Sequence, residues 1–165
     1  MGDYTFRSVT VDDLSMIGRW LKTPAVRRWW IDANGDPSDP IGPDDLAEAS
    51  VAMWIVSCDG HPFAYLQDYD PHADPDHHFA HLPPGARGID QFIGEPGMIG
   101  AGHGTAFICC RVEALFAQGV PAIGTDPHPD NARAIRAYEK AGFHQTTIQD
   151  TEWGRCLLME RHNIG

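Results

Sequence analysis

The sequence predicts one domain, residues 1–165, of mixed α-helix and β-strand in the α+β (mixed α/β) class. Strand-like segments joined by turns come first, and two long helical patterns alternate with strands near the end. A length of 165 residues suits a single domain with a sizeable core. Apolar residues make up 42% of the chain and charged residues 21%, which is typical of globular proteins. Parallel strand pairing is expected only around the two late helices.

The first part of the chain predicts a short strand followed by helices. Residues 4–9 are strand-like, and Thr10 is a suitable hydroxyl cap for a helix with apolar residues at helical spacing. Pro24 ends this helix and begins a second, shorter one. Gly, Pro and Asp make residues 32–43 a loop, after which Pro43 suits the first turn of another helix.

The middle of the chain predicts a hairpin, a long loop and a further strand. Residues 53–58 and 63–69 are strand-like, and the Asp59-Gly60 pair between them is a strong hairpin signal. Four prolines and a cluster of Asp and His residues make 70–85 a long, solvated acidic loop with a functional role. Strand character returns over residues 88–94.

The last part of the chain alternates helices with strands. Residues 102–117 show the clearest helical pattern, because their apolar side chains share one face. A short strand over 120–126 and a helix over 130–141 follow. A terminal hairpin is predicted from two strand-like segments, 143–149 and 155–161.

The charge balance limits the partners of the protein. Twelve Lys and Arg stand against 23 Asp and Glu, giving a formal net charge of −11. This charge argues against nucleic acids and anionic membrane surfaces and favours a cationic ligand. No apolar run is long enough for a membrane span, the N-terminus does not look like a secretory signal, and the four cysteines are too scattered for a disulfide scaffold or a thiolate zinc site. We therefore expect a cytoplasmic protein.

One glycine-rich turn has the composition of a phosphate-binding site. Gly100-Ala101-Gly102-His103-Gly104-Thr105 lies between a strand and the clearest helix, so its amides and the helix N-terminus can face an anion. The alternative is simply a tight strand-to-helix connection. The turn is not a P-loop, because no Gly-Lys-Ser/Thr follows, and it fits the dinucleotide fingerprint poorly.

A second pattern lies in the last helix. Asn131, Ile135 and Tyr138 recur at helical spacing, so an amide, an apolar side chain and a phenol share one face. A helix cap is the alternative role for Asn131. The surrounding stretch reads Asp-Pro-His-Pro-Asp-Asn-Ala-Arg-Ala-Ile-Arg-Ala-Tyr-Glu-Lys-Ala-Gly-Phe, from Asp126 to Phe143.

Together these motifs resemble the Gcn5-related N-acetyltransferase (GNAT) superfamily. The glycine turn resembles its motif A, and the stretch from Asn131 to Phe143 resembles its motif B. The resemblance covers most of the chain and is strongest to the aminoglycoside 6′-N-acetyltransferases. It also extends to Trp20-Leu21, Val26, Trp29-Trp30, Tyr65, Gln67, Tyr69 and Gly88-Ile89-Asp90-Gln91.

The resemblance implies a splayed, mostly antiparallel sheet with a parallel central pair, flanked by helices, and acetyl-CoA as cosubstrate in the split. The pantetheine arm would pair with the backbone of Phe92 and Ile93, and Asn131 would bond to that arm. The pyrophosphate would lie on the turn Gly100, Ala101, Gly102, His103, Gly104 and Thr105. Two positions depart from the family: Ile99 and Ala101 stand where polar or basic residues are common, which predicts weaker attraction of the cofactor.

The implied reaction is direct acetyl transfer from a thioester to a primary amine in a ternary complex. The amine is protonated at neutral pH and must lose a proton before it attacks. By its match to the family, Asp90 is the base, acting directly or through water. Tyr138 matches the family's phenol near the sulfur and is the general acid. The alternatives are an Asp90 paired with Arg87 and a Tyr138 that only packs on the sheet.

The acceptor is expected to be a polycationic amine, because Asp68, Asp70, Asp74 and Asp76 crowd one segment. Several carboxylates can each hold one ammonium group. By family position, Gln67 and Asp126 are substrate contacts, together with Asp74 or Asp76. Trp29 and Trp30 are an apolar wall or core residues. The irregular spacing of the Asp and His residues in 70–85 argues against a dedicated metal site.

Three alternative functions stay open. Acetylation of another small amine on the same scaffold, such as N-hydroxylysine in siderophore synthesis, is the first, although there we expect His where this chain has Asp90. A non-catalytic CoA-binding domain needs neither Asp90 nor Tyr138. Protein N-terminal acetylation is the third. The sequence is compatible with a monomer or a homodimer.

Overall fold

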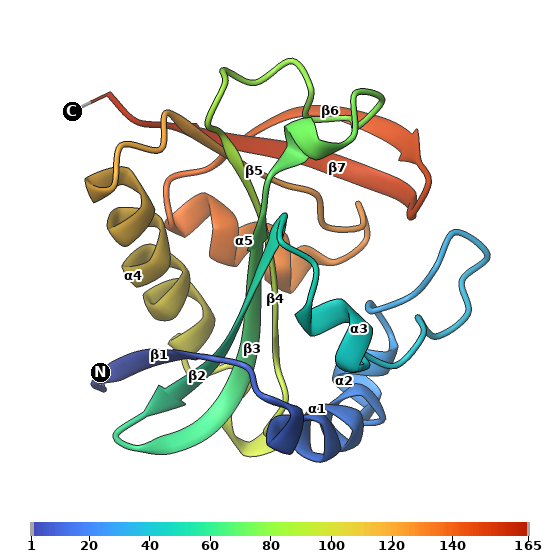
Figure 1. Ribbon diagram of the computed structural model, residues 1–165, viewed down its shortest axis with the longest axis vertical. Coiled ribbons are helices and arrows are strands. Elements are labelled where there is room, and N and C mark those ends of the chain that lie inside the picture. The colour runs from blue at the N-terminus through green and yellow to red at the C-terminus, as the bar shows by residue number, and fades with distance from the viewer. Residues whose placement is uncertain (1, 165) are drawn as a thin grey trace.

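Seven strands form one mixed sheet in the computed structural model, which describes residues 2–164. Their order across the sheet is β1-β2-β3-β4-β5-β7-β6 (Figure 1). Every neighbouring pair is antiparallel except β4 with β5, which is parallel. The strands are β1 (Tyr4–Ser8), β2 (Val51–Cys58), β3 (His61–Tyr69), β4 (Arg87–Ile93), β5 (Ala122–Thr125), β6 (His144–Thr151) and β7 (Gly154–His162). This sheet confirms the predicted fold class.

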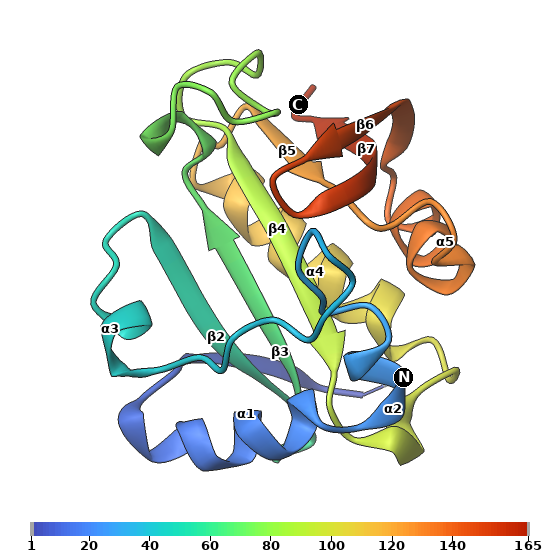
Figure 2. The same cartoon turned by 90° about the vertical axis from the view of Figure 1, so that its right-hand side faces the viewer.

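The sheet opens at its centre. Within the described chain, β4 pairs with β5 at only two positions, Arg87↔Ile123 and Gly88↔Gly124. One residue further on, the Thr125 hydroxyl donates a 2.9 Å hydrogen bond to the Ile89 carbonyl. Beyond this point the two strands diverge, as Figure 2 shows, and the remainder of β4 faces a gap on the β5 side.

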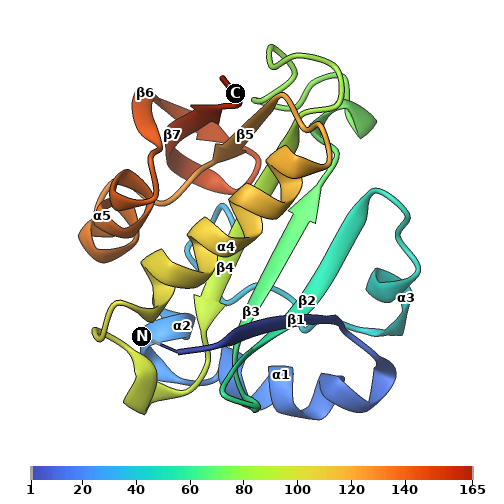
Figure 3. The same cartoon turned by 90° about the vertical axis from the view of Figure 1, so that its left-hand side faces the viewer.

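Helices cover both faces of the sheet (Figure 3). On one face lie α4 (His103–Ala117) and α5 (Ala132–Lys140), with apolar side chains of α4 such as Phe107 and Val112 in the main core. On the other lie α1 (Leu14–Leu21) and α2 (Pro24–Arg27), which pack Ile17 and Val26 into a second core cluster. Strand alternation explains the division, since Tyr65 joins the second cluster and its neighbour Leu66 joins the first.

The structure sharpens several predicted boundaries. The helix expected from Pro43 is a single turn, α3 (Pro43–Leu46), and a 3₁₀ turn (Val11–Asp13) precedes α1. Asp59 and Gly60 both take positive φ, 49° and 85°, as a tight hairpin between β2 and β3 requires. β4 ends before Gly94, where a Cβ atom would overlap the Trp20 ring.

The 70–85 segment is only in part the solvated acidic loop that its composition predicted: Asp74 and Asp76 are exposed, but other residues are buried. Phe79 is fully buried and Leu82 is 3% exposed, in a third cluster with Ala122 and Leu158. A burial of this kind outweighs the polar composition, because each large apolar side chain removed from water contributes about 1.5–3 kcal/mol. The segment therefore holds its histidines in fixed places beside the sheet.

Candidate active site

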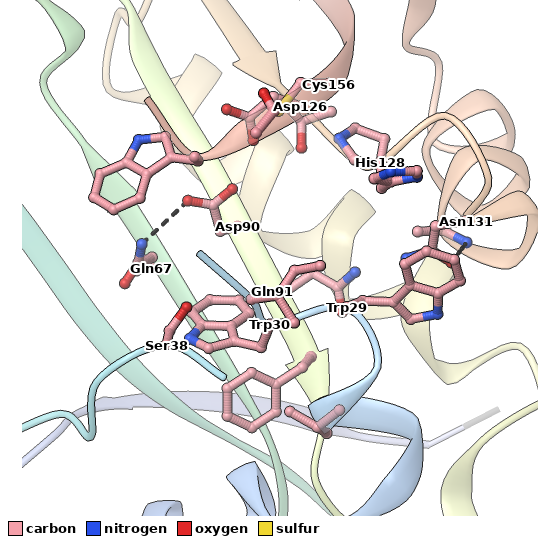
Figure 4. A pocket seen from close by; sticks show the side chains of 18 of the residues that line it. Trp29, Trp30, Ser38, Gln67, Asp90, Gln91, Asp126, His128, Asn131 and Cys156 are labelled. Atoms are coloured by element: carbon pink, nitrogen blue, oxygen red, sulfur yellow. Dashed lines mark hydrogen bonds between the residues drawn. The ribbon is translucent and has the colours of Figure 1, made fainter. Parts of the chain in front are cut away.

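A cleft of about 1590 Å³ occupies the split between β4 and β5. Figure 4 shows its central side chains, with Asp90 on β4 between Gln67 and Asp126. The cleft is lined by fourteen of the sixteen site residues singled out from the sequence: Trp29, Trp30, Gln67, Asp74, Asp90, Phe92, Ile93, Gly100, Gly102, Gly104, Thr105, Asp126, Asn131 and Tyr138. The other two, Ala101 and His103, lie outside the described lining.

Asp90 projects into the cleft from the middle of β4. Gln67, its register partner on β3, donates a 3.1 Å hydrogen bond from Nε2 to Asp90 Oδ2. Arg87, the partner considered from the sequence, instead binds Asp68 at 2.8 Å. Asp90 is therefore held by a neutral amide and has no guanidinium partner among the described residues, which suits a group that must exchange a proton.

Asp90 and Asp126 form a coupled pair of carboxyl groups. Burial raises the pKa of Asp90 well above its usual range, and the neighbouring Asp126 raises it further, whereas the Gln67 amide opposes this. Burial also raises the pKa of Asp126. Two carboxyl groups that interact in a poorly solvated site do not ionise independently, so their titration belongs to the pair.

Tyr138 faces this pair from α5. Its side chain is 3% exposed, and Gln91 Nε2 lies 3.5 Å from its hydroxyl. Burial and the charge of Asp90 both raise the pKa of Tyr138. The phenol therefore keeps its proton throughout the neutral range and can donate it.

The glycine turn has the backbone conformation of an anion-binding site. Gly100 and Gly102 take φ of 80° and 86°, values that favour glycine, and Gly102 is the N-cap of the 15-residue helix α4. The His103 ring points away, with Nδ1 2.7 Å from the Tyr4 hydroxyl. His103 can therefore bind an anion only through its backbone amide. Ala101 likewise needs no side chain for binding through the backbone of the turn.

The edge of β4 that faces the split offers backbone groups to a ligand. Phe92 and Ile93 pair with β3 at Tyr65 and Ala64, which leaves their other edge toward the cleft. Phe92 itself is anchored by stacking on Tyr65, with ring centroids 5.1 Å apart. An extended ligand entering the split meets this edge as it would a neighbouring strand.

Asn131 caps α5. Its Oδ1 accepts a 3.3 Å hydrogen bond from the Ala134 amide, so the capping alternative is realised in the structure. Since Asn131 also lines the cleft, the cap and the predicted bond to the cofactor arm are compatible. The latter stays a prediction.

The two tryptophans differ in their surroundings. Trp30 packs edge-on against Tyr65 and Phe92, at centroid distances of 6.0 and 5.1 Å, and so belongs to the core at the base of the cleft. Trp29 lies across the cleft against His128, 5.6 Å between centroids. Trp29 thus connects the segment after α2 with the segment after β5.

The acids of the 66–76 region do not act as one group. Asp74 is exposed on the cleft rim and Asp70 also lines the cleft, whereas Asp76 lies outside the lining. Asp68, expected to hold an ammonium group, is 2% exposed and is bound by Arg87 and Arg111, each at 2.8 Å. That expectation is wrong for Asp68, because two guanidinium groups already neutralise it inside the core.

The cleft lining also contains charged residues that were not singled out from the sequence. The basic ones are Arg133, Arg136 and Lys140 on α5, together with Arg28 and Arg155. The acidic ones are Asp32, Asp39, Asp45, Asp130 and Glu152, which join Asp70, Asp74, Asp90 and Asp126. The helical spacing of Arg133, Arg136 and Lys140 could have indicated a basic helix face, but the net charge of −11 for the whole chain drew attention to the acids.

His78 was also missed as a site residue, since it was considered only for metal binding. Its Nε2 lies 2.7 Å from Asp126 Oδ2. The described residues 2–164 contain no group of three His, Cys, Asp or Glu arranged to hold a metal ion. Across the same residues, every helix is too short or too polar to cross a membrane.

Comparison with known proteins agrees with this geometry. The acetyltransferase (GNAT) domain family matches residues 10–151, and the chain belongs to this family. Acetyl-CoA is the cosubstrate of GNAT domains, and the turn, the open β4 edge and the basic α5 fit its anionic and amide groups. The resemblance drawn from the sequence motifs is thereby confirmed.

Several of the similar proteins are aminoglycoside 6′-N-acetyltransferases. The chain is 36% identical over 162 residues to aminoglycoside N(6′)-acetyltransferase type 1 of Klebsiella pneumoniae, covering 94% of this chain and 81% of the relative. It is 46% identical over 77 residues to a kanamycin resistance protein of Rhizobium radiobacter, covering 46% of this chain and 71% of that protein. The crystal structure of AAC(6′)-Ib with coenzyme A and kanamycin has a TM-score of 0.84 at 36% identity, covering 97% of this chain and 95% of that one.

Proposed function

We propose that this protein transfers the acetyl group of acetyl-CoA to the 6′-amino group of an aminoglycoside. The observation that carries the proposal is the position of Asp90, on the β4 strand that borders the split and in a cleft that several other carboxylates line. The relative from Klebsiella pneumoniae bears this activity in its name, and related structures hold coenzyme A with kanamycin or ribostamycin.

The charged residues of the cleft support separate binding sites for the cosubstrate and for the amine. The glycine turn and the basic face of α5 attract the phosphates of the cosubstrate. The acidic residues attract an oligoamine, because each carboxylate can hold one ammonium group and all of them together raise its local concentration. A polycationic sugar and a polyanionic nucleotide thus enter one cleft.

The residues of the chain then supply proton transfer and positioning. Acetyl-CoA supplies an acetyl group activated as a thioester. Asp90 accepts the proton that the 6′-ammonium must lose, directly or through water, and Gln67 holds the carboxyl in place. Tyr138 donates a proton to the departing sulfur, since its hydroxyl stays protonated. Trp29 and Trp30 limit the access of water from the α2 side.

Assembly and location follow from the same proposal. We expect a single catalytic domain, 1–165, that acts as a monomer or homodimer in the cytoplasm, where acetyl-CoA is available. Neither nucleic acid nor membrane is needed as a partner. Light scattering measures the mass in solution, and cell fractionation of a tagged protein reports its location.

The deciding experiment is the release of free thiol from acetyl-CoA in the presence of kanamycin. Turnover is expected with aminoglycosides that carry a 6′-amino group and not with the analogue that carries a 6′-hydroxyl. Fragment masses of the product locate the acetyl group on the 6′-substituted ring. Turnover only with polyamines or hydroxamate precursors would overturn the aminoglycoside assignment and leave the fold and cosubstrate unchanged.

A further inference from the structure

The segment between β3 and β4 places one histidine against the catalytic carboxyl pair. The side chain of His78 is 5% exposed, and its Nε2 lies 2.7 Å from Asp126 Oδ2. Phe79, the next residue, is fully buried and fixes the backbone at this point. The His77 ring stacks on His78, with centroids 4.0 Å apart and planes 26° from parallel. His78 is therefore held in one orientation on both sides.

The chemistry of this contact follows from its neighbours. Burial lowers the pKa of His78, so its imidazole is neutral near pH 7. When Nε2 carries the ring proton, His78 donates it to the Asp126 carboxylate. Asp126 and Asp90 both line the cleft, and the charge of Asp126 raises the pKa of Asp90. A donor on Asp126 favours the ionised form of the pair. His78, Asp126 and Asp90 are thus linked in series, His78 to Asp126 by a close contact and Asp126 to Asp90 by the interaction of their charges.

We propose that His78 is a positioning residue for acetyl transfer: its bond to Asp126 fixes that carboxyl and sets the proton occupancy of Asp90. The inference rests on the proposed function, since it takes Asp90 as the group that accepts the proton of the amine. No bond to His78 forms or breaks in the reaction. One proton of the ammonium passes to Asp90, and the nitrogen lone pair forms the bond to the acetyl carbon. The C–S bond then breaks and the sulfur takes the proton of Tyr138, while the second proton that the nitrogen loses on becoming an amide returns Tyr138 to its protonated form.

Few other groups near His78 change charge in the same range. The acids that face it are Asp90, Asp126 and Glu152, and His81 is the further imidazole. His77, stacked on it, is influenced by the same Asp90 and Glu152 and by Asp74. Burial raises the pKa of Tyr69 and Tyr138, and that of Cys156 to about 11, so these three groups stay protonated. The acid side of a plot of kcat/KM against pH therefore reflects the ionisation of Asp90, Asp126, His77 and His78.

The test compares two substitutions of His78 with a matched control. His78→Phe removes the donor, whereas His78→Gln keeps an N–H donor of similar reach without a titrating ring. His81→Phe is the control, because His81 lies on the same segment, 2.7 Å from a carboxylate (Glu160), but is 55% exposed. The measurement is kcat/KM for kanamycin against pH at saturating acetyl-CoA.

The expected result separates positioning from folding. On the acid side, kcat/KM of His78→Phe falls about ten-fold below wild type and the two converge at high pH, since a hydrogen bond to a charged group contributes about this much. On the acid side, kcat/KM of His78→Gln and of His81→Phe equals that of the wild type. A wild-type acid side in His78→Phe, or an equal loss at every pH in both His78 variants, would overturn the proposal.

A measurement without substrate keeps this test independent of the proposed function. If the wild type acetylates no aminoglycoside, the proposed function fails, and nitrogen NMR of the imidazoles decides on His78. We expect the Nε2–H tautomer and a second titration step that follows the carboxyl pair. In Asp90→Asn this step moves to lower pH, because a lone carboxyl ionises more easily than a coupled one. An Nδ1–H tautomer, or no second step, would overturn the proposal.

Discussion

Gln67 and Asp90 are register partners on β3 and β4, and the Gln67 amide donates a 3.1 Å hydrogen bond to the Asp90 carboxyl. The Tyr65 hydroxyl donates to Gln67 Oε1 at 2.7 Å, which turns the NH₂ group of the amide toward Asp90. The amide favours the ionised carboxylate, whereas burial and Asp126 favour the protonated form. The balance of these three influences decides at which pH Asp90 can take a proton.

Gln67→Leu removes the amide that donates a hydrogen bond to Asp90 and favours its ionised form. The pKa of Asp90, already raised, rises further, and activity is present above this pKa and lost as pH falls through it. We expect the acid side of the kcat/KM profile to move to higher pH. Gln118→Leu, at an exposed position after α4, is the control, and an unmoved profile in Gln67→Leu would contradict the assignment of Asp90.

Asp90→Asn preserves the shape of the side chain and removes its ability to take a proton. Thiol release with kanamycin should fall by about 10²–10⁴-fold, the usual contribution of a general base, while acetyl-CoA binding by calorimetry is unchanged. Asp76→Asn, an exposed acid outside the cleft lining, should keep full turnover. Full turnover in Asp90→Asn would refute the role of this residue.

Tyr138→Phe retains the packing of the ring on Phe143, where the centroids are 5.5 Å apart, and removes the hydroxyl. We expect kcat to fall by about 10²-fold, because the thiolate then leaves without a proton donor. The affinity for acetyl-CoA and the melting temperature should stay near the wild-type values. Loss of cosubstrate binding instead of kcat would show that Tyr138 only shapes the cleft.

Asp68→Asn tests the buried ion pairs beneath the site. Asp68 is 2% exposed, binds Arg87 and Arg111, and accepts a 2.9 Å hydrogen bond from Trp54 Nε1. Neutralising it leaves two guanidinium groups uncompensated, and we expect the free energy of unfolding in urea to fall by about 3–5 kcal/mol.

The matched control for Asp68 is an exposed ion pair. Arg161 and Glu113 also lie 2.7 Å apart, but the Glu113 side chain is 63% exposed. Glu113→Gln should therefore change the free energy of unfolding by about 1 kcal/mol or less. Equal effects at both positions would show that burial does not govern these pairs.

The basic face of α5 is tested by Arg136→Gln combined with Lys140→Gln. The affinity for acetyl-CoA should fall, and it should depend less on salt than in the wild type, because charge attraction to phosphates is lost. The KM for kanamycin is expected to change little. Lys22→Gln, a neutralisation at an exposed position outside the lining, is the control. An unchanged affinity would place the phosphates elsewhere.

Strand and helix order followed from the sequence because local signals were strong. The Asp59-Gly60 turn and the helices over 103–117 and 132–140 have spacing and turn residues that determine local structure. The glycine turn was found from its residues and Asp90 from its match to the family, and the structure places both at the split. Their roles await the experiments above.

What the sequence did not reveal depends on contacts between distant segments. Asp68 was grouped with its acidic neighbours, but Arg111 reaches it from α4, 43 residues away. His78 was considered with other polar loop residues, but Phe79 and Leu82 bury the segment and direct the ring to Asp126. Composition alone cannot distinguish a solvated loop from a loop whose few apolar residues pack into a core cluster.

The narrow junction between β4 and β5 links the folding stability of the enzyme to the supply of its substrate. Among the described residues, two register pairs and one side-chain hydrogen bond join β4 to β5. A ligand bound in the split therefore adds contacts between the two halves of the sheet where the strands make few of their own. A ligand present at a hundred times its dissociation constant stabilises the folded state by about 2.7 kcal/mol. Bound acetyl-CoA should thus make the folded chain more resistant to proteolysis than the unliganded chain.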